Sequence, residues 1–449
     1  MIAPYSLKKI AAQCRLMANS VDEKKKLKFL FVSIDALIGD LAWEVKNEGH
    51  EIKYHIINKD QKDVCDGFVD KCDSWEENKD WADVVVFDDF GFGKEADELR
   101  KTGKPVVGGS TYSDKLELDR EFGQKELESV GISIIPRWNF TSFEEAEAFI
   151  EKTPDRYVLK PSGLAQNEKE LLFVGQEEDG KDVLDMLRRY KKNWGKKIKA
   201  FQLQKYISGV EVAVGAFFNG EDFASLINVN FEHKRMFPGE LGPSTGEMGT
   251  SMLFAKTSPI FDATLAKMKD RLAASGYVGY IDINCIVNSR GIYPLEFTSR
   301  FGYPHVSIMM EGVLSEWGQF LYGIAKKEKP EFRTKHAFEI GVVVAVPPFP
   351  FDDPKAFAKY SEGATIIFKK PVYEGIHLGD VKLDEQDWKL AGNSGYALVV
   401  TGSGTTMEEA RSVAYNRVKN IMIPNMFYRT DIGKRWSEDR DRLTTWGYL

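Results

Sequence analysis

The chain has 449 residues, of which 43% are hydrophobic, 12% aromatic and 29% charged, a composition that excludes disordered and collagen-like proteins. The formal net charge is −7 and basic residues form only short groups, so the charge pattern does not indicate a nucleic-acid partner. At roughly 100 to 200 residues per domain, this length predicts about three domains.

The cysteines are few and widely spaced, and they form neither a disulfide framework nor a zinc motif: Cys14, Cys65, Cys72 and Cys285. The N-terminal segment lacks a continuous apolar core, and no run of about 18 apolar residues occurs along the chain. We therefore expect a cytoplasmic protein with no signal peptide and no membrane span.

The first part of the chain alternates between strand and helix patterns. Strands are expected at 27–33, 51–57, 82–88 and 105–108, with helices at 37–45 and 94–102 between them. Such alternation predicts a doubly wound parallel sheet. We assign this α/β domain to residues 27–113, after an N-terminal extension at 1–26.

The pattern changes after residue 113, where strands follow one another. A helix at 116–130, a strand at 132–136 and a helix at 142–151 precede the strands 157–161, 170–174, 200–206, 211–219, 223–231, 279–287 and 291–298. Consecutive strands favour mixed or antiparallel sheets. A helix at 308–324 and the charged linker 326–331 close this central region, 114–330.

The last part of the chain, 331–449, has an α+β pattern. Strands are expected at 338–346, 365–368 and 396–401, followed by a helix at 407–421. The segment is short and carries few strands, so we expect a small C-terminal α+β domain.

Two strands joined by the tight turn 288–290 carry the strongest chemical signal. If the turn is centred on Ser289, Asp282 lies opposite Glu296, and like charges at that spacing require a cation between them. Glu296, Thr298 and Arg300 alternate along one strand and so share a face with Asp282. Oxygen ligands of this kind suit Mg²⁺. The alternative is an exposed hairpin with a solvated carboxylate pair, but the apolar residues on its other face favour a functional site.

Several short motifs, in order from about residue 80 to residue 435, resemble those of the ATP-grasp carboxylate-amine ligases, and within them the phosphoribosylamine–glycine ligase (glycinamide ribonucleotide synthetase) family. The agreement is specific because many motifs occur in the same order. They are GGST at 108–111, YVLKPSGLA at 157–165, SGVE at 208–211, EHKR at 232–235, GPSTGEMG at 242–249, LEFTSRFG at 295–302, SGYALVVT at 394–401 and YRTDIG at 428–433.

The resemblance implies an N-terminal α/β domain, a two-lobed ATP-grasp region whose lid lobe covers about 155–210, and a C-terminal domain. It also implies ATP-dependent formation of an acyl phosphate, which an amine attacks to form a C–N bond, with ATP and Mg²⁺ (or Mn²⁺) as cofactors. It assigns nucleotide binding to Arg120, Lys160, Gln204, Tyr206 and Glu211, metal binding to Asp282, Glu296 and Thr298, catalysis to Arg300 and Lys234, and substrate contacts to Arg235, Gly242, Ser244, Thr245, Gly246 and Met248. We expect His233 and His305 to be structural.

Three stretches depart from the family pattern. The lid loop at 166–170 lacks the family's glycines, and Thr298 replaces a metal-binding asparagine close to an altered segment, Tyr303–His305. The first strand-to-helix turn, 33–40, carries acidic residues where the family has a glycine-rich turn for the phosphate of phosphoribosylamine. Acidic residues at a helix start repel phosphate.

The sequence therefore predicts a purine-biosynthesis ligase that joins a small carboxylate such as glycine to an amine such as phosphoribosylamine. Two alternatives stay open: a divergent ligase with a different amine, and a non-catalytic nucleotide-binding protein. The expected partners are small-molecule substrates, without nucleic acid or membrane, and the expected state is a monomer or a homodimer.

Overall fold

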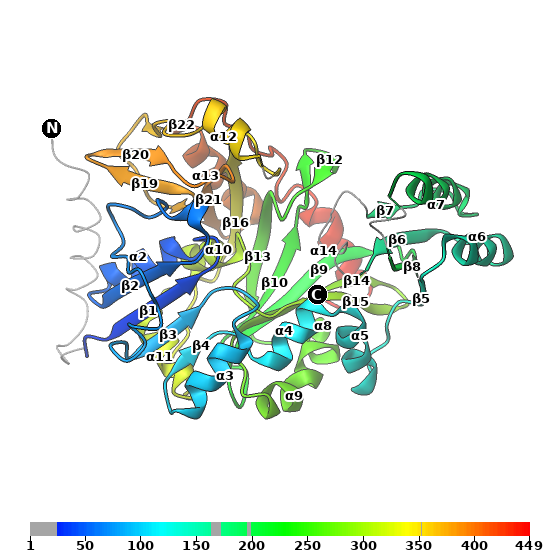
Figure 1. The fold of residues 1–449 in the computed structure, drawn as a ribbon, viewed down its shortest axis with the longest axis horizontal. Helices are drawn as coiled ribbons and strands as arrows, with labels where there is room; N and C mark the ends of the chain where they lie inside the picture. Colours follow the sequence, from blue (N-terminus) through cyan, green and yellow to red (C-terminus); the bar gives the residue numbers. More distant parts are fainter. Residues whose placement is uncertain (1–24, 163–171, 195–198, 352) are drawn as a thin grey trace.

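The computed structural model describes residues 25–162, 172–194, 199–351 and 353–449. A parallel sheet and a long antiparallel sheet lie side by side, and a smaller lobe projects from the far end (Figure 1). The N-terminal extension at 1–26 lies almost entirely outside the described residues. No helix in the described ranges is long and apolar enough to cross a bilayer.

The parallel sheet has the strand order β2-β1-β3-β4, and all three pairings are parallel, which confirms the predicted parallel sheet. β1, β3 and β4 are almost entirely buried, as expected for a parallel sheet with covered faces, whereas the edge strand β2 alternates between buried and half-buried residues. Its elements are β1 (Lys28–Ser33), α2 (Gly39–Asn47), β2 (Glu51–Ile56), β3 (Val84–Phe87), α3 (Gly93–Lys101) and β4 (Val106–Val107).

The central sheet has eight strands in the order β15-β14-β9-β10-β13-β16-β21-β18, and every neighbouring pair is antiparallel. Its strands are β9 (Val210–Asn219), β10 (Ile227–Glu232), β13 (Gly249–Ala255), β14 (Val278–Asn288), β15 (Gly291–Thr298), β16 (Phe338–Ala345), β18 (Ile376–Leu378) and β21 (Tyr396–Gly404). The last three come from the segment after residue 331, so this segment extends the central sheet directly. The proposed domain boundary at 330/331 stays a prediction.

The projecting lobe contains a four-stranded sheet, β5-β8-β6-β7, under two helices (Figure 1). It has its own hydrophobic core, separate from the main one. Its elements are β5 (Arg137–Phe140), α6 (Phe143–Lys152), β6 (Tyr157–Pro161), β7 (Phe173–Val174), α7 (Lys181–Trp194) and β8 (Phe201–Lys205). We did not predict α7 from the sequence.

Three expected elements differ in the structure. The prediction of a single helix at 116–130 is wrong, because α4 (Thr111–Leu118) ends before Asp119 and α5 (Arg120–Ser129) begins after it. Asp119 has an extended backbone, and its side chain accepts from the amide of Phe122 and so caps α5. No strand occupies 132–136, because β5 starts only at Arg137. The helix at 308–324 is two helices, α10 (His305–Gly312) and α11 (Trp317–Ala325).

The remaining elements are short and flank the sheets. They are η1 (Lys59–Gln61), β11 (Arg235–Phe237), β12 (Leu241–Ser244), α8 (Pro259–Ala263), η4 (Leu265–Met268), α9 (Lys269–Ala274), α12 (Pro354–Tyr360), β17 (Ile367–Phe368), β19 (Val381–Asp384), β20 (Asp387–Leu390), α13 (Met407–Val418), β22 (Ile421–Met422) and α14 (Trp436–Thr445).

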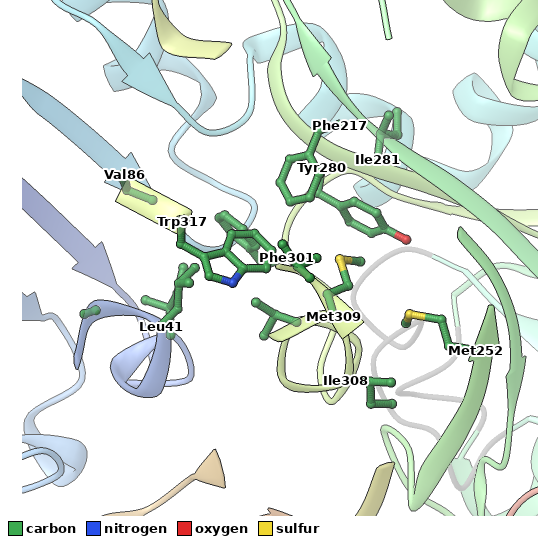
Figure 2. Packing of buried hydrophobic residues seen from close by; sticks show 14 of the residues in the cluster. Leu41, Val86, Phe217, Met252, Tyr280, Ile281, Phe301, Ile308, Met309 and Trp317 are labelled. Atoms are coloured by element: carbon green, nitrogen blue, oxygen red, sulfur yellow. The ribbon is translucent and has the colours of Figure 1, made fainter. Parts of the chain in front are cut away.

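One hydrophobic core joins the parallel sheet to the central sheet (Figure 2). Leu41 of α2 and Trp317 of α11 lie on one side of it, and Phe217 of β9 lies on the other, where its ring meets that of Trp317 edge to face. Burying an aromatic side chain of this size contributes about 1.5–3 kcal/mol. The shared core therefore holds the end of the parallel sheet against the strands that carry the candidate site.

Candidate active site

The hairpin of β14 and β15 has a different register from the predicted one. Asp282 pairs with Thr298, and Glu296 pairs with Asn284. The predicted pairing of Asp282 with Glu296 is wrong, because the turn has two residues between Asn288 and Gly291 and a β-bulge follows at Asn284/Cys285. Asp282, Glu296 and Thr298 still share one face of the hairpin, since paired residues in a ladder point to the same side.

Lys234 is the centre of a cluster of carboxylates on this face. Its Nζ lies 3.0 Å from Glu211 Oε1, 3.2 Å from Glu232 Oε2 and 3.4 Å from Glu296 Oε1. These charges outweigh the effect of burial and hold the pKa of Lys234 well above its ordinary value. The structure thus brings together Lys234, Glu211 and Glu296, which the sequence assigned to three different roles.

Arg120 and Lys160 bring positive charge to the same place from two other elements. Arg120 is the first residue of α5, and Lys160 lies on β6 of the projecting lobe. Burial, with Arg120 and Lys234 nearby, lowers the pKa of Lys160 to about 8 despite the opposing Glu296. Lys234 first, and then Lys160 and Arg120, lower the pKa of Glu296 to about 2. Lys234 is therefore paired with Glu296, and Lys160 and Arg120 are close enough to act on the charge of the same carboxylate, where the lobe sheet faces the central sheet.

His305 lies in a second group of carboxylates, next to the first. Its Nε2 is 3.2 Å from Glu247 Oε2 and 3.6 Å from Glu232 Oε1, and its Nδ1 is 3.6 Å from Asp282 Oδ2. Burial favours the neutral ring, but the carboxylates outweigh it and raise the pKa of His305 well above its ordinary value. From the sequence we predicted a structural role for His305. The altered segment Tyr303–His305 was the feature of the sequence that could have indicated its place in this group.

Arg300 lies beyond the end of β15 and turns toward the parallel sheet. Its Nε donates to Glu117 Oε1 at 3.1 Å and lies 2.9 Å from Asp89 Oδ1. Because β15 ends at Thr298, the expectation that Arg300 continues the strand face of Glu296 is wrong. The guanidinium therefore stands at the boundary between the hairpin and the carboxyl edge of the parallel sheet.

The glycine-rich segment 242–249 divides into an exposed half and a buried half. Gly242 and Ser244 belong to β12, which pairs with β11, and Arg235 Nη1 donates to the carbonyl of Gly242 at 3.0 Å. Thr245 binds back to the carbonyl of Lys234 through its amide, at 2.7 Å, and through its hydroxyl.

In the same segment, Gly246 is exposed, whereas Met248 is fully buried and its carbonyl accepts from Val343 on β16. The six residues assigned to the substrates therefore do not form one surface.

Arg429 holds this segment in place, and the sequence analysis did not single it out. It is fully buried; its guanidinium donates to Asp431 and Glu240, and Nη1 donates to the carbonyl of Arg235 at 2.9 Å. Asp431 in turn accepts from the amide of Gly239. In the sequence, the YRTDIG motif at 428–433 could have pointed to Arg429. In the structure, Arg429 and Asp431 of this motif hold the β11–β12 hairpin in place.

The residues expected around adenine lie at the end of β8. Gln204 is buried and pairs with Val158 of β6, two residues from Lys160. The amide of Tyr206 donates to the carbonyl of Arg156, whose guanidinium lies 3.5 Å from the centre of the Tyr206 ring. The altered lid loop at 166–170 lies outside the described residues.

Acidic residues gather at the carboxyl edge of the parallel sheet. Ser33 at the end of β1 donates to Asp88, which follows β3. Burial first, and then the neighbouring Asp89, raise the pKa of Asp88 well above its ordinary value. Asp35 in the first turn adds to the negative potential at Asp89. The acidic turn noted in the sequence thus lies beside further acidic residues, Asp88 and Asp89, at the end of β3.

The central sheet and the sheet of the projecting lobe, with cationic side chains gathered around Glu296 between them, define an ATP-grasp enzyme. Residues 118–306 match the ATP-grasp (A) domain of phosphoribosylglycinamide synthetase, and residues 339–435 match the C domain of the same enzyme. Together these ranges span more than half of the chain. The chain belongs to the phosphoribosylglycinamide synthetase family.

Curated relatives agree with this assignment, and solved structures share the fold. The chain is 26% identical over 347 residues to a phosphoribosylamine–glycine ligase of Streptococcus pneumoniae, covering 76% of this chain and 80% of the relative. It is 29% identical to that of Caulobacter vibrioides, covering 77% and 81%.

The phosphoribosylamine–glycine ligase structure from Thermotoga maritima has a TM-score of 0.68 at 21% identity, covering 90% of this chain and all of that one. The biotin carboxylase domain of Hydrogenobacter thermophilus 2-oxoglutarate carboxylase, solved with MgADP and bicarbonate, has a TM-score of 0.63 at 13% identity, covering 95% and 100%.

Proposed function

We propose that this protein is an ATP-dependent ligase that joins glycine to phosphoribosylamine through an acyl phosphate, with release of ADP and phosphate. The observation that carries the proposal is the convergence of Arg120, Lys160 and Lys234 on Glu296, in a chain of this family. Phosphoryl transfer depends mainly on positioning and on neutralising charge, and these side chains can supply both.

In this proposal the residues of the site divide the binding of ATP and the acyl group between them. Arg120 and Lys160 would bind the ATP phosphates from α5 and from the projecting lobe, respectively. Gln204 and Tyr206 would contact adenine, and Glu211 would contact the ribose. Lys234 is already paired with three carboxylates, so it would exchange one of them for a phosphate or acyl oxygen when the substrates bind.

The donor set of the hairpin fits a magnesium ion. Glu296 provides a carboxylate and Thr298 a hydroxyl on the same face, and Mg²⁺ prefers one or two such protein ligands together with phosphate oxygens. When bound, the ion would neutralise charge on the transferred phosphoryl group. Mn²⁺ prefers the same kinds of ligand and is the alternative.

Arg300 would stabilise the acyl phosphate near the amine. Its guanidinium lies between the hairpin and the carboxyl edge of the parallel sheet, where ligands of open α/β sheets bind. The amine would enter from this edge and attack the acyl carbon.

A second candidate is the same ligase chemistry with an amine that lacks phosphate. The observation that favours it is the acidic edge formed by Asp35, Asp88 and Asp89, where the guanidinium of Arg300 is already paired with Asp89 and Glu117 and so is not free to bind a phosphate.

ADP release tests both candidates. Purified protein is incubated with Mg-ATP, glycine and phosphoribosylamine generated in place, and the product is identified by mass spectrometry. We expect glycinamide ribonucleotide, with activity reduced at least about 100-fold in Glu296→Gln and unchanged in Glu98→Gln, an exposed position on α3. ADP formed only with unphosphorylated amines would support the second candidate, and no ADP with any pair would contradict both.

A further inference from the structure

The group around His305 has the composition of a metal site and has no task in the reaction proposed above. One ligand atom each of Glu232, Glu247 and His305 lie within 4.8 Å of one another. The three residues come from separate parts of the chain: the end of β10, the loop before β13, and the first residue of α10. The tertiary fold therefore builds this group.

The group is buried and incompletely satisfied by the protein. Glu247 and His305 are buried, and Glu247 Oε1 accepts no hydrogen bond from the described residues. Leaving a carboxylate oxygen buried without a partner costs free energy. A bound cation would remove that cost.

Asp282 provides an independent indication. It is 1% exposed, and neither of its oxygens accepts a hydrogen bond from the described residues. Its Oδ2 lies 3.6 Å from His305 Nδ1, the ring nitrogen that faces away from Glu232 and Glu247. Metal-bound histidines usually donate their other ring N–H to a carboxylate, and Asp282 is the carboxylate that faces Nδ1 here, at a distance that a small movement on metal binding would close.

We propose that Glu232, Glu247 and His305 Nε2 bind a divalent transition-metal ion, with Asp282 as the residue that orients His305. Two carboxylates and one imidazole form a mixed oxygen and nitrogen set, which suits Mn²⁺, Fe²⁺ or Zn²⁺ better than Mg²⁺. Three protein ligands leave coordination positions for water or a substrate group. Asp282 then has a positioning role instead of the ligand role assigned from the sequence.

This site is separate from the nucleotide metal and does not depend on the proposed reaction. Glu296 takes no part in it. The two sites are linked through Glu232, whose other oxygen lies 3.2 Å from Lys234 Nζ and accepts from Asn284 Nδ2 at 3.1 Å. The carboxylate of Glu232 would therefore lie between a bound ion and Lys234.

Mn²⁺ binding without nucleotide tests the proposal. The full chain is stripped with a chelator and titrated with Mn²⁺ alone, and the bound ion is observed by electron paramagnetic resonance. We expect one bound ion with a nitrogen coupling from imidazole. His305→Gln should remove the coupling and weaken binding at least about 100-fold, and Asp282→Asn should weaken it about 10- to 100-fold.

Matched variants separate this site from its alternatives. His336→Gln, at an exposed histidine, and Glu296→Gln, at the nucleotide-metal residue, should both leave nucleotide-free binding and the nitrogen coupling intact. Glu247→Gln replaces His305→Gln if the latter does not fold. Equal Mn²⁺ affinity in the wild type, His305→Gln and Glu247→Gln would overturn the proposal. The group would then be an ion pair between protonated His305 and its carboxylates. Loss of binding in Glu296→Gln would overturn it by placing the ion at the nucleotide site.

Discussion

At the residue scale, the environment of Lys160 decides its ionisation. Lys160 lies on β6, where burial and the nearby Arg120 lower its pKa to about 8. A lysine of this kind changes charge close to physiological pH, whereas an exposed lysine does not. Its value as a phosphate ligand therefore depends on pH.

We predict that the KM for ATP rises as the pH increases above about 8, because Lys160 loses its proton and its charge. Lys160→Arg should keep its charge and show a flat KM over the same range, since arginine stays protonated. The measurement is the pH profile of KM(ATP) for the two proteins. Parallel profiles would contradict the assignment of Lys160 to the phosphates.

At the element scale, side chains at the ends of elements position the charged residues of the site. Asp119 caps α5 by accepting from the amide of Phe122 at 3.0 Å, and Arg120 is the next residue. Arg429 clamps the β11–β12 hairpin, which follows Lys234. Neither residue needs to touch a substrate to affect the site.

Asp119→Ala should lower the free energy of unfolding by about 1 kcal/mol, because an amide at the start of α5 loses its cap. Asp119→Asn should retain most of the stability, since asparagine also caps helices. Urea denaturation measures both changes. Equal losses in the two variants would show that charge, and not capping, is what Asp119 provides.

Arg429→Met should destabilise the protein by about 1–3 kcal/mol, because Glu240, Asp431 and the carbonyl of Arg235 would lose the donor that they share. The matched control is Arg440→Met, at an exposed pair with Asp441, which should change stability by less than about 0.5 kcal/mol. Thermal and urea unfolding check the difference; similar small effects in both variants would contradict the clamp.

At the scale of the whole molecule, contacts between the parallel sheet and the helices of the central region hold the two sheets together. Glu48 at the end of α2 accepts from the amides of Trp317 and Gly318, the first residues of α11. Burial outweighs these hydrogen bonds and raises the pKa of Glu48 to about 8.

This raised pKa predicts a pH dependence of stability. Between about pH 4.5 and 8 the folded protein holds a proton on Glu48 that the unfolded chain has released, so the contribution of Glu48 to stability falls as the pH rises through this range. Glu48→Gln should remove on the order of 1–3 kcal/mol of this dependence, and Glu98→Gln should not. Urea unfolding at pH 5.5 and pH 8.5 provides the measurement.

The sequence predicted the elements that rest on local pattern. The strands and helices of the parallel domain, the hairpin and the family motifs depend on periodicity and turn residues, which are local. The break at Asp119 was missed because a helix pattern continues on both sides of it. The hairpin register was missed because a bulge shifts the pairing without changing the pattern of buried residues.

By itself the sequence determined the class of fold, the family and most of the residues that carry charge into the site, because these follow from local patterns and from the order of short motifs. Only the tertiary structure decided which charges meet. Lys234 with three carboxylates and His305 with Glu232, Glu247 and Asp282 are contacts between residues far apart in the chain. Side-chain partners of this kind depend on how sheets and helices pack, and a local pattern does not contain that information.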